Sequence, residues 1–238
     1  MRELLAVRDQ VVESGAMRYD AKVVATPITQ IFDPAFPSLQ AQPVTEGGRN
    51  AAWYIDCDGH KGVLRHYRRG GWAASVSQDR YLWTGARNVR SLNEFDMLRS
   101  LYEAGLPVPR PYAAVYWKQG FAYRAAIIME EIPNVRPLAS ALDDADSEQV
   151  ARAIYTMHEQ GVWHADLNAY NVLLDPEGRA WLIDFDKARR TTLSLERRSA
   201  NLLRLRRSLA KVVGVRGISW WDELNRNYAI LSRSIDGL

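Results

Sequence analysis

Three polar side chains in the second half of the chain have the types and spacing needed for phosphoryl-group transfer. Asp166 lies two positions after His164, Asn171 lies five positions after Asp166, and Asp184 follows a further apolar stretch. A carboxylate can orient an acceptor hydroxyl and take its proton. Carboxylate and amide oxygens are the hard ligands that magnesium prefers. We therefore assign Asp166 the role of catalytic base, and Asn171 and Asp184 the role of metal ligands.

Two short apolar runs would position these ligands. Residues 171–174 and 180–183 have the composition of β-strands, and the intervening Asp175-Pro176-Glu177-Gly178 is typical of a turn. Such a sequence predicts a β-hairpin. Because Asn171 opens the first run and Asp184 follows the second, the hairpin would bring the two residues together.

The combined pattern resembles the catalytic and metal-binding loops of protein-kinase-like phosphotransferases, H-x-D-L-x-x-x-N followed by D-F-G. The resemblance implies ATP and Mg²⁺ as cofactors. It also implies an α+β fold with two lobes. Residues 1–131 would form an N-terminal lobe with an antiparallel sheet and one helix that binds the nucleotide phosphates. Residues 132–238 would form a mainly helical C-terminal lobe with the catalytic and metal-binding loops. His164 is expected to brace the metal-binding loop.

The first half of the chain contains a second hairpin signal. Residues 50–57 and 62–67 are strand-like, and Asp58-Gly59 between them is a two-residue turn. In a kinase-like lobe, a glycine-rich turn before such a pair lies over the nucleotide phosphates. Gly47 and Gly48 occupy that position, although the full glycine pattern is absent.

The same resemblance implies a positively charged side chain on a β-strand that binds the nucleotide phosphates. Arg65 takes the position of the kinase lysine, and Lys61 on the same strand face is the alternative. Residues 91–104 have helical periodicity, so Glu94 can pair with Arg65 as the kinase helix glutamate does. Alternatively, Ser91 and Glu94 form a capping box at the helix start.

The remaining elements follow from periodicity and turn residues. The segment after residue 129 resembles a kinase hinge, in which backbone groups of Glu130 and Ile132 bond the adenine edge. Residues 193–213 are predicted to form an amphipathic helix, and Leu195 and Val212 belong to its apolar side. Further strands are expected at 23–26, 112–117 and 121–129, and further helices at 147–160 and 221–235.

Composition limits the classes of protein. A single cysteine, Cys57, excludes an intramolecular disulfide, and no apolar run is long enough to cross a bilayer. The chain has 26 arginines and 5 lysines, with a net charge of only +3. Clustered arginines indicate solvated surfaces, an anionic acceptor or an anionic membrane surface. No motif points to nucleic acid or to an obligate protein partner.

The chain also resembles the 3-deoxy-D-manno-octulosonic acid (Kdo) kinases of Gram-negative bacteria, in the lipopolysaccharide kinase family. This resemblance implies ATP-dependent phosphorylation of the 4-hydroxyl of Kdo on a lipid A precursor, in lipopolysaccharide inner-core biosynthesis. It also implies peripheral association with the cytoplasmic face of the inner membrane. Within the Arg-His-Tyr-Arg-Arg-Gly-Gly stretch, Arg68 and Arg69 are candidate substrate-binding residues. The resemblance is carried by residues 47–49, 51–53, 63–71, 94–95, 105–109 and 164–186.

Three alternatives remain open. One is a kinase of another envelope sugar such as heptose, and a second is an atypical protein kinase. Asn168 stands where protein kinases carry a lysine, which disfavours a protein acceptor. The third is a pseudokinase scaffold, which the complete set of Asp166, Asn171 and Asp184 disfavours.

Overall fold

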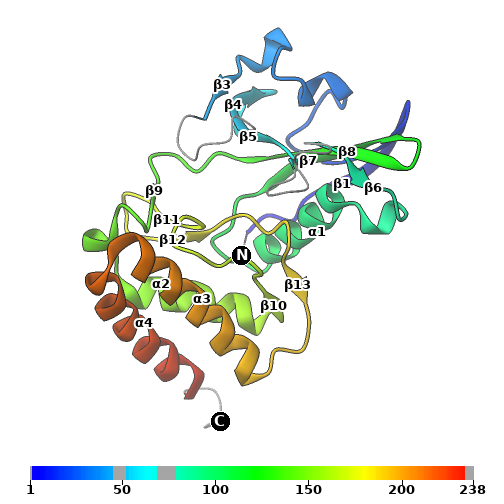
Figure 1. Ribbon diagram of the computed structural model, residues 1–238. Coiled ribbons are helices and arrows are strands. Elements are labelled where there is room, and N and C mark those ends of the chain that lie inside the picture. The colour runs from blue at the N-terminus through cyan, green and yellow to red at the C-terminus, as the bar shows by residue number, and fades with distance from the viewer. Residues whose placement is uncertain (1, 45–51, 69–78, 234–238) are drawn as a thin grey trace. The chain divides into compact units, whose positions relative to one another are not determined.

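The structure is a computed structural model that describes residues 2–44, 52–68 and 79–233 (Figure 1). The chain divides into two compact units. The first comprises Met1–Glu103 and Arg110–Glu131, and the second comprises Ala104–Pro109 and Ile132–Leu238. The first unit contains an antiparallel sheet with one long helix, and the second contains three long helices. The expected α+β class, with the sheet N-terminal and the helices C-terminal, is confirmed.

The first unit is built on one antiparallel sheet of eight strands (Figure 1). The strand order is β1-β2-β7-β8-β5-β4-β3, and β6 pairs with β8. Most residues of the central strand β8 are apolar and buried, as is typical of a strand whose two faces are both covered. The bounds are β1 Val7–Val12, β2 Gly15–Asp20, β3 Gln42–Pro43, β4 Ala52–Cys57, β5 His60–His66, β6 Tyr81–Leu82, β7 Pro111–Gln119 and β8 Ala122–Glu130.

Turn chemistry closes the β4–β5 hairpin as expected. Cys57 lies opposite His60, so Asp58 and Gly59 form a two-residue connection. Both turn residues have positive φ, +52° at Asp58 and +84° at Gly59. Turns of this kind match the twist of paired strands, and glycine and aspartate tolerate the left-handed backbone.

The two faces of the sheet are covered differently. Helix α1 (Arg90–Glu103) packs against β7 and β8 with Phe95, Leu98 and Leu101 buried, which confirms the predicted helix. Gly105, at φ +87°, follows its end. Ile128 belongs to a separate core cluster on the sheet. That cluster also receives side chains from the short 3₁₀ helices Thr29–Phe32 and Pro37–Leu39.

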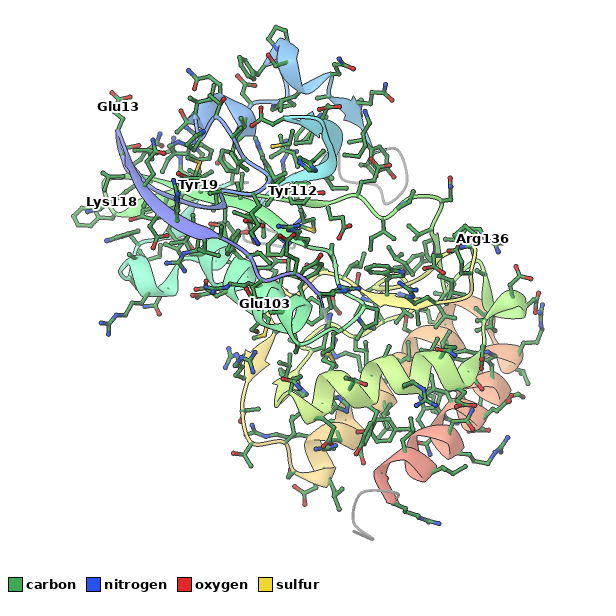
Figure 2. The ribbon with its side chains drawn as sticks, turned by 180° about the vertical axis from the view of Figure 1, so that it is seen from behind. Glu13, Tyr19, Glu103, Tyr112, Lys118 and Arg136 are labelled. Carbon is green, nitrogen blue, oxygen red and sulfur yellow. The ribbon has the colours of Figure 1, made fainter. Side chains whose placement is uncertain are left out.

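The expectation of a strand at residues 23–26 is wrong. The N-terminal strands are β1 and β2, and the chain turns after Asp20, with the backbone N–H groups of Val23 and Val24 both donating to the Asp20 carbonyl. Val23 and Val24 are buried apolar residues within this turn, and burial alone produced the strand-like signal. Figure 2 labels Glu13 at the β1–β2 turn and Tyr19 on β2, where Tyr19 joins the core.

The second unit packs helix α4 (Val215–Arg233) against α2 (Ser147–Glu159) and α3 (Leu195–Val213) (Figure 1). Helix α4 begins six residues before the predicted start. The prediction missed this part because Val215 and Arg216 are exposed and the first turn lacks apolar periodicity. On α3, Leu202, Leu205 and Leu209 are buried, but Leu195 and Val212 are exposed, contrary to prediction. The remaining strands are β9 Arg136–Pro137, β10 Val162–Trp163, β11 Val172–Leu174, β12 Ala180–Leu182 and β13 Arg189–Arg190, with a 3₁₀ turn at Leu142–Asp144.

Candidate active site

The loop that carries Asp166 is held by side-chain amides of its own residues. Both Asn168 and Asn171 donate through Nδ2 to the Asp166 carbonyl, at 3.0 and 2.9 Å. Asn168 Oδ1 accepts from the backbone N–H groups of Tyr170 and Asn171, at 2.8 and 3.2 Å. These short-range bonds fix the loop while the Asp166 carboxylate stays 49% exposed. Because the amide nitrogen of Asn171 is used, its Oδ1 is the atom available to a cation.

The predicted hairpin is confirmed and places Asp184 beside Asn171. Strands β11 and β12 pair antiparallel, with Val172 opposite Leu182. The pairing extends one residue further, because Ile183 N–H donates to the Asn171 carbonyl at 3.1 Å. Asp184 is the next residue, so the hairpin's open end carries an amide oxygen and a carboxylate.

The backbone at Asp184 is unusual. Its φ is +63°, in the left-handed region that a residue with a Cβ enters at a cost of roughly 1–2 kcal/mol. Such strain persists only where surrounding structure imposes it, and it gathers at functional sites. Here Phe185, the next residue, is buried against the ring of His164 at 4.8 Å between centroids.

His164 braces this strained segment, as predicted. Its Nδ1 accepts from the Asp166 N–H at 3.2 Å, so Nε2 carries the proton and donates to the Ile183 carbonyl at 2.9 Å. Burial lowers the pKa of His164 below its ordinary value, which keeps the ring neutral. The histidine therefore links the loop of Asp166 to the segment that carries Asp184, and both of its ring nitrogens are engaged there.

Helix α3 supplies support that sequence reasoning missed. The buried Asn201 accepts from His164 N–H at 3.1 Å and donates to the His164 carbonyl at 2.7 Å. Asn201 Oδ1 also lies 3.1 Å from His158 Nε2. Ser208 Oγ accepts from Ala169 N–H at 3.1 Å, and Arg204 Nη1 lies 3.4 Å from Asp166 Oδ1. The only signal in the sequence was a polar residue, Asn201, on the apolar stripe of Leu205 and Leu209.

In the first unit, Arg65 on β5 forms the expected ion pair with Glu94 of α1. Glu94 is 1% exposed, and it also accepts a hydrogen bond from the buried Tyr67 hydroxyl. The Arg65 guanidinium lies 5.2 Å from the centre of the Tyr67 ring. A buried carboxylate and an aromatic ring thus orient an arginine that remains 25% exposed.

Two alternatives predicted from the sequence fit less well: Lys61 as the phosphate-binding cation, and a capping box formed by Ser91 and Glu94. Lys61 is 69% exposed and pairs with Asp56 at 3.2 Å, outside the Arg65 cluster. Ser91 Oγ donates to the Val115 carbonyl at 2.9 Å, so it is not the helix cap of a capping box. Arg65 is therefore the cation that α1 orients.

Comparison with known proteins decides the family. Residues 35–228 match the lipopolysaccharide kinase (Kdo/WaaP) family. The chain belongs to this family. It is similar to a 3-deoxy-D-manno-octulosonic acid kinase of Stenotrophomonas maltophilia (strain R551-3), with 44% identity over 226 residues, 93% of this chain and 90% of that protein. Proteins of the same name from Xylella fastidiosa (strain M12) and Xanthomonas campestris pv. campestris (strain B100) are 42% and 43% identical over the same shares.

The structure of this lipopolysaccharide kinase family member describes only some of the other predicted site residues. Gly47, Gly48 and Arg69 lie outside the described residues, and Arg68 is exposed on the segment after β5. Glu130 ends β8, and its N–H donates to the Arg110 carbonyl at 2.8 Å, so adenine contact would use its own carbonyl. Ile132 begins the longer segment of the second unit.

In this family member, the aromatic residues of β6 and of the segment after it pack on the sheet. Trp83 stacks on Tyr116 at 5.3 Å between ring centres, and Tyr81 is buried beside Tyr123. These aromatic contacts therefore stabilise the sheet.

The donor set suits magnesium better than a transition metal. Within residues 2–44, 52–68 and 79–233, no three His, Cys, Asp or Glu side chains gather as metal ligands. Magnesium needs only one or two protein oxygens when phosphates supply others. Asn171 Oδ1 and the Asp184 carboxylate meet that need.

Among the same described residues, no helix is long and apolar enough to cross a membrane.

Proposed function

We propose that this protein is a Kdo kinase, which transfers a phosphoryl group from ATP to a hydroxyl of Kdo on a lipid A precursor in lipopolysaccharide inner-core biosynthesis. The names of relatives at 41–44% identity support this function. The observation that carries it is the exposed Asp166 carboxylate on a loop whose Asn171 adjoins Asp184. The family resemblance points to the 4-hydroxyl as the acceptor.

In the proposed reaction, Asp166 orients the acceptor hydroxyl and takes its proton. A bond forms between the hydroxyl oxygen and the γ-phosphorus as the bond to the bridging oxygen of ADP breaks. Two amide hydrogen bonds on its carbonyl hold Asp166 in place, so little reorganisation is required before transfer. His164 stays neutral and keeps the two loops together.

Asn171 and Asp184 would hold Mg²⁺, which when bound would offset the negative charge of the phosphates. Arg65, oriented by Glu94, binds phosphate oxygens. In this proposal, Gly47 and Gly48 are assigned to phosphate binding from the sequence, and the Glu130 carbonyl and the Ile132 N–H would bond the adenine edge. In this proposal, residues 1–131 and 132–238 are the N-terminal and C-terminal lobes of a protein-kinase-like fold.

The acceptor also bears on location. A lipid-linked sugar is presented at a membrane surface, so we propose peripheral association with the cytoplasmic face of the inner membrane. The excess of arginine over lysine supports contact with anionic groups. Arg68 and Arg69 are proposed to contact the substrate.

The decisive experiment incubates the protein with ATP, Mg²⁺ and a Kdo-bearing lipid A precursor, followed by mass analysis of the lipid. We expect a single added phosphate on the Kdo residue and none without Mg²⁺. A heptose-bearing acceptor and a serine-bearing protein in parallel reactions test the alternatives. Transfer to either of these and not to Kdo would replace the proposal, and ATP binding with no transfer to any acceptor would favour a scaffold.

A further inference from the structure

Helix α3 contacts the catalytic loop at three successive points. Asn201 holds both backbone groups of His164, Arg204 Nη1 lies 3.4 Å from Asp166 Oδ1, and Ser208 Oγ accepts from the N–H of Ala169. Residues three, four and seven positions apart share one helix face. The two flanking contacts set the position of α3 against the loop, so the place of Arg204 beside Asp166 is built into the fold.

Arg204 is not explained by its contribution to stability. Its side chain is 42% exposed, and an exposed ion pair at 3.4 Å contributes little to folding. Neighbouring arginines on α3 are engaged more closely: Arg198 lies 2.6 Å from Glu159, and Arg206 lies over the ring of Trp221. Within the described part of the chain, Arg204 makes no other ion pair or hydrogen bond, so most of its five N–H donors remain for a ligand.

The catalytic loop lacks any cation of its own. Residues 164–171 contain no lysine or arginine, and His164 is neutral. Asn168, at the position of the protein-kinase lysine, uses its amide to hold the loop. An anionic acceptor placed against Asp166 is repelled by that carboxylate, and Arg204 is the cation beside Asp166 that can offset the repulsion.

The proposed acceptor is such an anion. Kdo is a sugar acid whose carboxyl group is attached to ring carbon C2, and the 4-hydroxyl lies on a carbon two positions along the same ring. A hydroxyl seated at Asp166 thus brings a carboxylate close to the same side chain. A guanidinium matches a carboxylate with two parallel N–H donors.

We propose that Arg204 binds the carboxylate of the acceptor sugar and so selects a sugar acid over a neutral sugar. This inference rests on the proposed function. The arginine is an acceptor-binding residue, and its contact with Asp166 places the carboxylate relative to the reacting hydroxyl.

The test compares two acceptors, the Kdo-bearing lipid A precursor and the same molecule with the Kdo carboxyl converted to a primary amide. Wild-type protein should lose roughly 10- to 100-fold in kcat/KM on the amide, the range expected for a hydrogen bond to a charged group. Arg204→Gln should lose a similar factor on the carboxylate acceptor and discriminate little between the two. Arg204→Lys should retain part of the preference. The exposed Arg207→Gln on the same helix is the control and should behave as wild type.

The KM for ATP and the unfolding midpoint of Arg204→Gln should stay close to those of wild type. Equal losses of Arg204→Gln on both acceptors, or none, would overturn the inference while leaving the kinase function intact. Absence of transfer by wild type to the Kdo-bearing precursor would instead remove the proposed function, and this inference with it.

Discussion

The two units hold their functional side chains by opposite means. In the first unit, Arg65 is held by an ion pair to Glu94, a carboxylate that is 1% exposed. In the second, Asp166 lies on a loop held by neutral groups: the imidazole of His164 and the amides of Asn168 and Asn201. Asp166 itself is 49% exposed.

The difference follows from what each side chain is proposed to meet. A cation that binds phosphate tolerates a permanent carboxylate behind it, because the pair keeps its position and the outer donors stay available. A carboxylate that takes a proton or binds a metal would lose that capacity if a buried cation neutralised it. Neutral hydrogen bonds can hold such a group in place without consuming its charge.

The largest expected effect is on turnover in the second unit. Asp166→Asn keeps the shape of the side chain and its loop, but removes the proton acceptor, so kcat should fall by roughly 10³-fold. ATP affinity, measured by thermal shift with nucleotide, should change little. Asp144→Asn, which breaks an exposed pair with Arg136 in the same unit, is the control. Full turnover of Asp166→Asn would remove this residue from the mechanism.

In the first unit, replacing the charged support should affect stability and ATP together. Glu94→Gln leaves a partly buried guanidinium without its carboxylate, which should cost about 3 kcal/mol in the free energy of unfolding. The KM for ATP should rise because Arg65 loses its orientation. Glu148→Gln breaks the exposed Glu148–Arg152 pair and should cost less than about 0.5 kcal/mol. Urea denaturation and ATP-dependent rates measure both, and equal costs for the two variants would contradict the role of burial.

The neutral support can be broken in the same way. Asn201→Ala removes the buried hydrogen-bond partner of the His164 N–H, the His164 carbonyl and the His158 Nε2. We expect this loss to cost about 2 kcal/mol in the free energy of unfolding. Asn227→Ala, which removes a single, partly buried hydrogen bond to Ser147 in the same unit, should cost clearly less. If Asn201→Ala had wild-type stability and turnover, α3 would not support the loop.

The smallest effect is a pH dependence of stability, to which His158 of the second unit contributes. Burial lowers the pKa of His158 from 6.5 to about 4, so the folded state resists a proton that the unfolded state binds. The neutral ring of His158 therefore contributes fully to the free energy of unfolding above pH 6.5. This contribution falls as the pH drops toward 4, and about 1 kcal/mol is lost at pH 5.5. His164 is shifted in the same direction. Urea denaturation at pH 8 and 5.5 should show a smaller loss for His158→Gln than for wild type.

Local sequence signals predicted much of the fold and the hairpin that brings two candidate site residues together. Alternation and turn residues located β4, β5, β7 and β8, because their period and turn chemistry depend on neighbours in the chain. Asn171 and Asp184 were paired by a hairpin whose strands are short and whose turn is unambiguous. The strand expected at 23–26 failed because buried valines occur in turns as well as in strands.

The order of residues along the chain was enough to predict the candidate chemistry of this protein, since carboxylate, amide and histidine at fixed spacing within one loop and one hairpin depend on contacts between near neighbours. Tertiary packing alone decided what surrounds them. Asn201, Arg204 and Ser208 reach the catalytic loop from 37 to 39 positions away in sequence. A local sequence pattern cannot predict these contacts, because they form only when α3 packs against the loop of Asp166.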